Sequence, residues 1–104
     1  MRLRVSAPGR ELKPAEVDQV ERDLEKIDRR LHGWDTVSAE VRISNGSGAP
    51  ETHVVIELEY GRNHLIAKAD HKDWGQAVRE AREELLRQIN DRSPRGHSSI
   101  AKGR

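Results

Sequence analysis

The most informative segment of the 104-residue chain is VVIELEYGRNHLIAKA, residues 54–69. Apolar residues recur at every second position on both sides of Gly61-Arg62, which is the pattern of two half-buried strands. A two-residue turn at Gly61-Arg62 pairs Tyr60 with Asn63, keeps the core positions on one face, and has glycine first, as a type II′ turn requires. A four-residue loop preserves the same parity, so the pattern leaves the loop length open.

Two further segments share this period of two. In the first, Met1, Leu3 and Val5 alternate with two arginines, and Pro8-Gly9 then breaks the strand. The other strand is predicted from an alternating apolar set, Val37, Ala39, Val41 and Ile43. A loop rich in Gly and Ser follows at residues 45–50.

Two segments have the period of an amphipathic helix. The first runs from Pro14, which suits the first helical turn, to a stop at Gly33, with an apolar stripe made by Val17, Val20, Leu24, Ile27 and Leu31. For the second, Asp73 is a suitable N-cap and Gln76 its capping-box partner. Its inner face is predicted to contain Ala77, Val78, Ala81, Leu85 and Ile89.

The resulting order, β-α-β-β-β-α, predicts an α+β fold with two helices on one face of a four-stranded, mainly antiparallel sheet. We expect one domain over residues 1–93 and a basic disordered tail over residues 94–104. The expected core comprises Val5, Val20, Leu24, Ile27, Val41, Ile56, Leu58, Ala67, Val78, Ala81 and Leu85.

Composition excludes several classes of function. The chain contains no cysteine, which rules out disulfides, thiolate chemistry and cysteine-based zinc sites. No run approaches the length of a membrane span and no signal-peptide core is present, so we expect a cytoplasmic location. Residues 92–104 contain four Lys or Arg and no acid, whereas residues 1–91 contain 15 basic and 18 acidic residues, a net charge of −3.

Two stretches resemble a known family. One is ELKPA at residues 11–15 followed by VERDLEKI at 20–27, and the other is LIAKADHKDWGQAV at 65–78 followed by LLRQIN at 85–90. In order and spacing, they are similar to the short ribosome hibernation factors, the family of hibernation-promoting factor and ribosome-associated inhibitor A. The resemblance covers roughly residues 1–92 and implies a fold like that of double-stranded RNA-binding domains.

The resemblance also implies a function. It predicts a translation inhibitor that binds ribosomal RNA on the small ribosomal subunit and occupies the sites of mRNA and tRNA during stress. No cofactor, metal or small-molecule substrate is implied, and we expect a monomer when the protein is free. The residues to which we assign RNA binding are Arg22, Lys26, Arg29, Arg42, Arg82, Arg87 and Arg92.

Four residues depart from the family pattern. Asp23 stands where the family often has Lys, and Glu84 and Asp91 stand at positions that are usually Lys, whereas Arg79 replaces a common Asp. An acid in place of a base removes a phosphate contact and adds repulsion. The alternative hypothesis is therefore a protein-interaction module that keeps the fold but has lost ribosome binding.

Simpler interpretations exist for each candidate group. Arg22, Lys26 and Arg29, at i, i+4 and i+7, form either a phosphate-binding row or a solvated face paired with neighbouring acids. The tail is either an electrostatic grip or solubilising disorder. Trp34 and Trp74 are interpreted as core residues rather than stacking platforms.

Catalysis and metal binding are not predicted. The histidines near the hairpin, His53, His64 and His71, lack the spacing of a metal site and are expected to be exposed strand residues. Glu57 and Glu59 point to an open face without an apolar pocket that would shift a pKa. With no phosphate-binding loop or nucleophile motif, we expect that the protein is not an enzyme.

Overall fold

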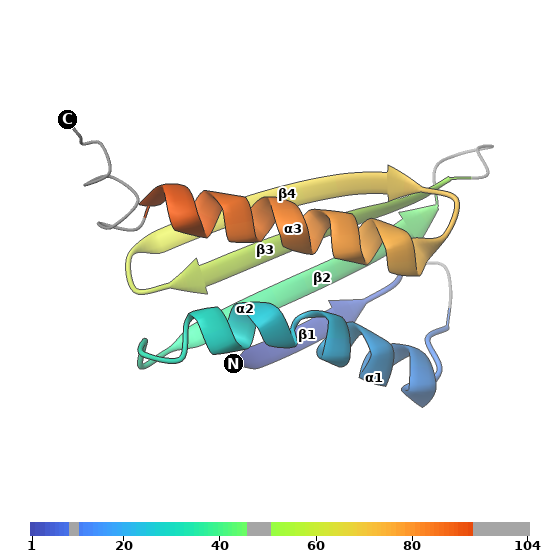
Figure 1. Ribbon diagram of the computed structural model, residues 1–104. Helices are drawn as coiled ribbons and strands as arrows, with labels where there is room; N and C mark the ends of the chain where they lie inside the picture. Colours follow the sequence, from blue (N-terminus) through green and yellow to red (C-terminus); the bar gives the residue numbers. More distant parts are fainter. Residues whose placement is uncertain (9–10, 46–50, 93–104) are drawn as a thin grey trace.

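A computed structural model describes residues 1–8, 11–45 and 51–92. Four strands form one sheet with helices on one of its faces (Figure 1). The strands are β1 (Arg2–Ser6), β2 (Val37–Asn45), β3 (Thr52–Tyr60) and β4 (Asn63–His71), and the helices are α1 (Pro14–Asp23), α2 (Glu25–Arg30) and α3 (Trp74–Arg92). The α+β class and the predicted element order are confirmed. The predicted tail at residues 94–104 lies outside the described residues.

The strands are ordered β1-β2-β3-β4, with β1 parallel to β2 and the other pairs antiparallel. Tyr60 pairs with Asn63, and Leu58 pairs with Leu65. This register confirms the two-residue turn at Gly61-Arg62 and excludes the four-residue loop. The predicted parity therefore holds, and the apolar positions of all four strands face the helices.

Gly61 is required at this turn for two reasons. Its φ of +59° lies in the left-handed region that L side chains rarely adopt. A Cβ atom placed there would also lie 2.4 Å from Cζ3 of Trp34, whose ring rests on the turn. The backbone and the neighbouring indole thus both favour glycine.

Gly61→Ala is expected to lower the free energy of unfolding by about 1–3 kcal/mol through backbone strain and the contact with Trp34. Gly33→Ala is the matched control, because a Cβ atom at Gly33 meets nothing within 4 Å. Urea denaturation of both variants measures the difference. Equal losses at the two glycines would contradict this account of the turn.

The first predicted helix is interrupted at Leu24, which separates α1 from α2. Nη1 of Arg82, on α3, donates a hydrogen bond to the backbone carbonyl of Asp23 at 3.1 Å. The N–H of Ile27 donates instead to the carbonyl of Leu24 at 3.0 Å. A side chain that enters the backbone hydrogen-bond ladder bends a helix, and this insertion explains the break.

Asp73 caps α3 as predicted, because its carboxylate accepts a hydrogen bond from the N–H of Gly75 at 3.1 Å. The capping box with Gln76 is wrong. The N–H of Asp73 donates to Nδ1 of His71 at 3.0 Å, while the Gln76 side chain accepts from Arg79 at 2.7 Å. The preceding strand residue therefore satisfies the donor that Gln76 was expected to satisfy.

The core lies between the sheet and the helices. All of the predicted core residues are buried except Val5, which is half-buried because β1 is an edge strand. Trp74 packs against the core from the start of α3, but Trp34 is 46% exposed, so its assignment to the core is wrong. No helix in the described part of the chain is long and apolar enough to span a membrane.

Candidate nucleic-acid interface

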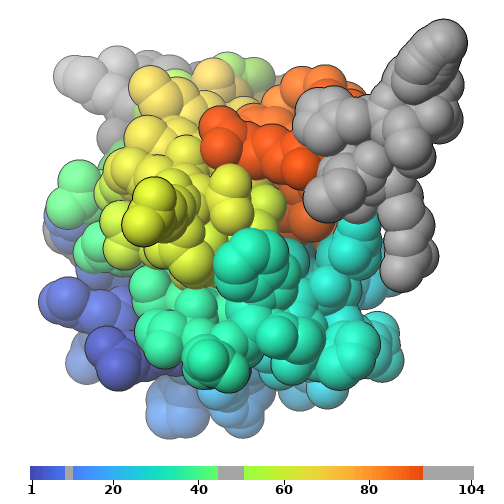
Figure 2. Space-filling model, turned by 90° about the vertical axis from the view of Figure 1, so that its left-hand side faces the viewer, coloured from blue at the N-terminus to red at the C-terminus, as the bar shows by residue number. Residues whose placement is uncertain are grey.

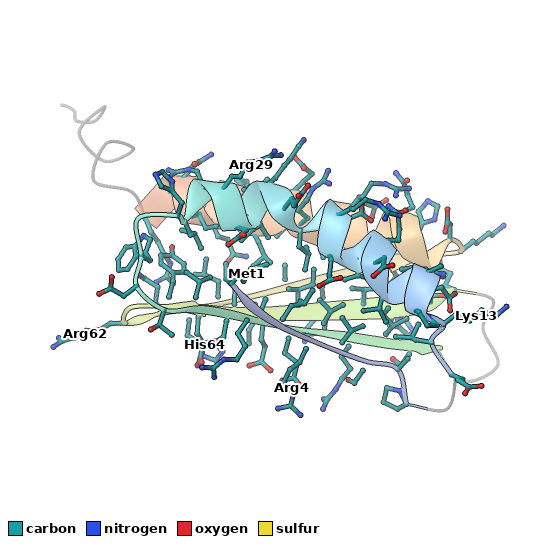
Figure 3. All side chains as sticks on the ribbon, turned by 90° about the horizontal axis from the view of Figure 1, so that it is seen from below. Met1, Arg4, Lys13, Arg29, Arg62 and His64 are labelled. Carbon is teal, nitrogen blue, oxygen red and sulfur yellow. The ribbon has the colours of Figure 1, made fainter. Side chains whose placement is uncertain are left out.

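Three basic side chains form what we call the helix row, Arg22 on α1 with Lys26 and Arg29 on α2. All three are exposed, and Arg29 points away from the sheet, opposite to Arg4 and His64 (Figure 3). All three side chains are thus accessible on the helical layer, on both sides of the interruption at Leu24.

Acidic residues of α1 and α2 lie close to one end of the helix row. A groove of about 400 Å³ between these helices and β1 is lined by Asp18, Glu21, Glu25 and Asp28 together with Arg22 of the helix row. The Met1 amino group lies 3.3 Å from the Asp28 carboxylate. Arg22 thus lies beside these acids, whereas Lys26 and Arg29 do not line the groove.

The helix row forms no ion pair with any residue that the structure describes. Arg22 donates a hydrogen bond to the side-chain oxygen of Gln19, a neutral partner, at 2.8 Å. Within residues 1–8, 11–45 and 51–92, none of the three basic groups forms a salt bridge with a carboxylate. The alternative prediction was a solvated face on which these three cations pair with neighbouring acids. No such pair forms among the described residues.

Arg82 and Arg87, on α3, already interact with other groups of the protein. The Arg82 side chain is only 13% exposed and contacts Glu83 at 2.8 Å in addition to the Asp23 carbonyl. Arg87 is well exposed, but its guanidinium binds Glu84 at 2.6 Å and Asp91 at 2.9 Å. Hydrogen bonds from Arg87 and then Gln88 lower the pKa of Glu84 to about 2. Glu84 is therefore charged at neutral pH, and its carboxylate and that of Asp91 both pair with Arg87.

Arg42 lies on the other side of the molecule. It is an exposed residue of β2, on the sheet face opposite the helices. That face has mixed charge, with His64 hydrogen-bonded to Glu57 at 2.9 Å and His53 to Asp70. These two histidines occupy the open face as predicted, and the described residues contain no group of three or more potential metal ligands.

Arg92 and Arg30 both lie at the end of the molecule where α2 and α3 finish. Arg92 donates to the Asn63 side chain at 3.4 Å, and Arg30 to the Asn90 side chain at 3.2 Å. Both are exposed and hydrogen-bond to neutral groups. Arg30 was not among the residues predicted from the sequence, although it follows Lys26 by four positions and so lies next to the helix row.

Comparison with known families gives a clear result. The model of the family described as Sigma 54 modulation protein / S30EA ribosomal protein matches residues 3–95. The chain belongs to this family. The resemblance to ribosome hibernation factors, inferred from the stretches within residues 11–27 and 65–90, is confirmed, and with it the assignment to a family of ribosome-associated proteins.

Two solved structures share the fold. The N-terminal domain of Protein Y from Thermus thermophilus has a TM-score of 0.74 at 21% identity, over 86% of this chain and 96% of that one. A ribosomal subunit interface protein from Coxiella burnetii has a TM-score of 0.75 at 15% identity, over 88% and 96%. A comparison with curated protein sequences found no match.

Two of the departures from the family pattern are explained by each other. Asp23 is 8% exposed, and its carboxylate lies 3.7 Å from Nη1 of Arg79 and accepts a hydrogen bond from Gln19 at 3.1 Å. The acid at position 23 and the base at position 79 thus form an ion pair between α1 and α3. Asp23 faces the protein interior and removes no cation from the helix row.

Proposed function

We propose that this protein is a hibernation factor that inhibits translation by binding ribosomal RNA on the small ribosomal subunit. It acts by occupying the sites of mRNA and tRNA and needs neither a chemical step nor a cofactor. It works in the cytoplasm as a monomer when free, with residues 1–93 as the binding domain and the basic residues 94–104 as an added electrostatic grip.

The observation that carries this proposal is the helix row. Arg22, Lys26 and Arg29 are exposed and free of salt bridges within the described residues. Phosphate groups are contacted by accessible basic side chains that are not already compensated. Membership of a ribosome-associated family supports ribosomal RNA as the source of those phosphates.

The other residues that we assign to RNA binding contribute unequally to it. Arg92 adds a cation at the end of α3, and Arg87 contributes only the charge that Glu84 and Asp91 leave uncompensated. Arg82 mainly joins α3 to α1, so its effect on RNA is indirect. Arg42 reaches RNA only where RNA also passes along the open sheet face.

The second candidate is a protein-interaction module that has lost ribosome binding. One observation favours it: two acids, the half-buried Glu84 and the exposed Asp91, occupy the α3 surface where the family usually has Lys. A basic protein partner would suit that surface. The two candidates differ in which face, if any, lies against RNA.

The proposal is tested with single cysteines, because the natural sequence has none. An iron chelate attached through Lys26→Cys should cleave the RNA of purified small subunits at restricted positions. The same chelate at Lys68→Cys, on the open sheet face, should cleave more weakly or elsewhere. Cleavage from position 68 alone would show that the helical layer faces away from RNA.

A further inference from the structure

The end of the molecule contains an exposed tryptophan that the fold holds in place. Figure 2 faces this end, where residues that follow α2 lie beside the β3–β4 turn and the end of α3. The Trp34 ring meets Tyr60 edge to face, with centroids 5.0 Å apart and planes at 74°. One side of its six-membered ring rests on Gly61. Trp34 is nevertheless 46% exposed, unlike a core residue.

A cavity of about 280 Å³ lies against Trp34. Its apolar part is formed by Leu31, Tyr60 and Ile89, which are buried core residues. Its polar part is formed by Arg30, Asn63 and Arg92. Ligand sites combine an apolar wall with a few convergent polar groups in this way.

The two arginines supply uncompensated positive charge. Arg30 and Arg92 hydrogen-bond to the neutral amides of Asn90 and Asn63, and neither forms a salt bridge with a carboxylate among the described residues. Burial raises the pKa of Tyr60, while the charges of Arg92 and Arg30 act on that pKa in the opposite direction. Both arginines line the cavity together with Trp34 and Tyr60.

We propose that this cavity binds one unstacked nucleotide of single-stranded RNA. The base would stack on the exposed part of Trp34, the phosphate would lie between Arg30 and Arg92, and the Asn63 amide would meet a base edge. The exposed aromatic surface suits stacking on a base. The two cations, which have further hydrogen-bond donors, suit binding of a phosphate. This inference rests on the proposed function and adds a second type of contact, base stacking, to the phosphate contacts of the helix row.

The test uses Trp34 as its own reporter. In a Trp74→Phe background Trp34 is the single tryptophan, and titration with a uridine hexanucleotide at low salt should quench its fluorescence. Arg30→Gln and Arg92→Gln should each weaken binding about tenfold, because each removes a charged hydrogen-bond donor. Arg62→Gln is the matched control, since this exposed arginine points away at the same end of the molecule and should leave binding within about twofold (Figure 3).

The aromatic contribution is measured in the natural background by filter binding of the labelled hexanucleotide. Trp34→Ala should weaken binding about tenfold to a hundredfold, whereas Trp34→Phe, which keeps a stacking ring, should stay within a few-fold of the natural protein. If Trp34→Phe and Trp34→Ala weaken binding equally, Trp34 does not stack on a base and only covers Tyr60. Absence of quenching by RNA, or quenching by an acidic peptide instead, would overturn the nucleotide site.

Failure of this inference is distinguishable from failure of the proposed function. If the hexanucleotide does not bind but small subunits still bind through the helix row, only the nucleotide site is wrong. If neither binds, the proposed function fails as well. If the hexanucleotide binds at Trp34 and subunits do not, the cavity is an RNA site outside the ribosome.

Discussion

Leu24→Ala is expected to lower the free energy of unfolding by about 2–5 kcal/mol, as large-to-small changes in well-packed cores do. Leu24 is fully buried at the junction of α1 and α2, where the helical hydrogen bonds are already interrupted by Arg82. Relaxation around the cavity is limited because the sheet and α3 pack against the same core.

Urea denaturation followed by circular dichroism measures this change. Ile66→Ala is the control, because Ile66 has a comparable side chain but is 45% exposed on the open sheet face. Its effect on the free energy of unfolding should stay below about 1 kcal/mol. A decrease of less than about 0.5 kcal/mol for Leu24→Ala would mean that the stripe of the first helix is not part of the core.

Reversal of the helix row to Glu, at Arg22, Lys26 and Arg29 together, is expected to weaken binding to small subunits by roughly a thousandfold. Each interaction between a charged donor and a phosphate contributes on the order of 1.5 kcal/mol or more, and the three positions meet separate parts of the RNA backbone. The slope of log affinity against log salt should fall by about 0.7–0.9 for each phosphate group that the variant no longer binds.

The matched control for the helix row reverses three exposed cations of the open sheet face, Arg2, Arg4 and Lys68. It changes the net charge by the same amount, so it separates a specific face from general repulsion. Sedimentation with purified subunits measures both variants. Equally weakened binding by the two triple variants would show that binding depends only on net charge.

Reversal of two acids on α3 should strengthen binding to small subunits, in contrast to reversal of the helix row. Glu84→Lys with Asp91→Lys removes both acids from Arg87 and adds two cations to the helical layer. Binding to subunits should therefore become stronger. Unchanged binding by this variant, together with tight binding by the natural protein, would indicate that α3 does not face RNA.

Strand pairing was predictable from residues 54–69 because the side-chain period of a strand leaves little choice of register. Tyr60 and Asn63 flank the turn, and a shift of one residue would expose Ile56 and Leu58. The interruption at Leu24 was not predictable, because it depends on Arg82, which lies 59 positions from Asp23 in the sequence. Local periodicity contains no information about such contacts.

The candidate interface was predictable in part. Spacing of Arg22, Lys26 and Arg29 placed them on one surface, but only the structure shows that none of them forms a salt bridge with a carboxylate within the described residues. The pairing of Arg87 with Glu84 and Asp91 has i,i+3 and i,i+4 spacing, so the sequence contained that signal. The exposure of Trp34 had no such signal, because it depends on the position of the β3–β4 turn.

The central claim is that this protein binds the small ribosomal subunit through phosphate contacts. Sedimentation of the natural protein with purified small subunits, repeated from about 50 to 200 mM salt, tests it most directly. We predict binding at low salt with an affinity that falls steeply and linearly on logarithmic axes. Absence of binding even at the lowest salt would contradict the claim and favour an interaction module that kept the fold and no longer binds the ribosome.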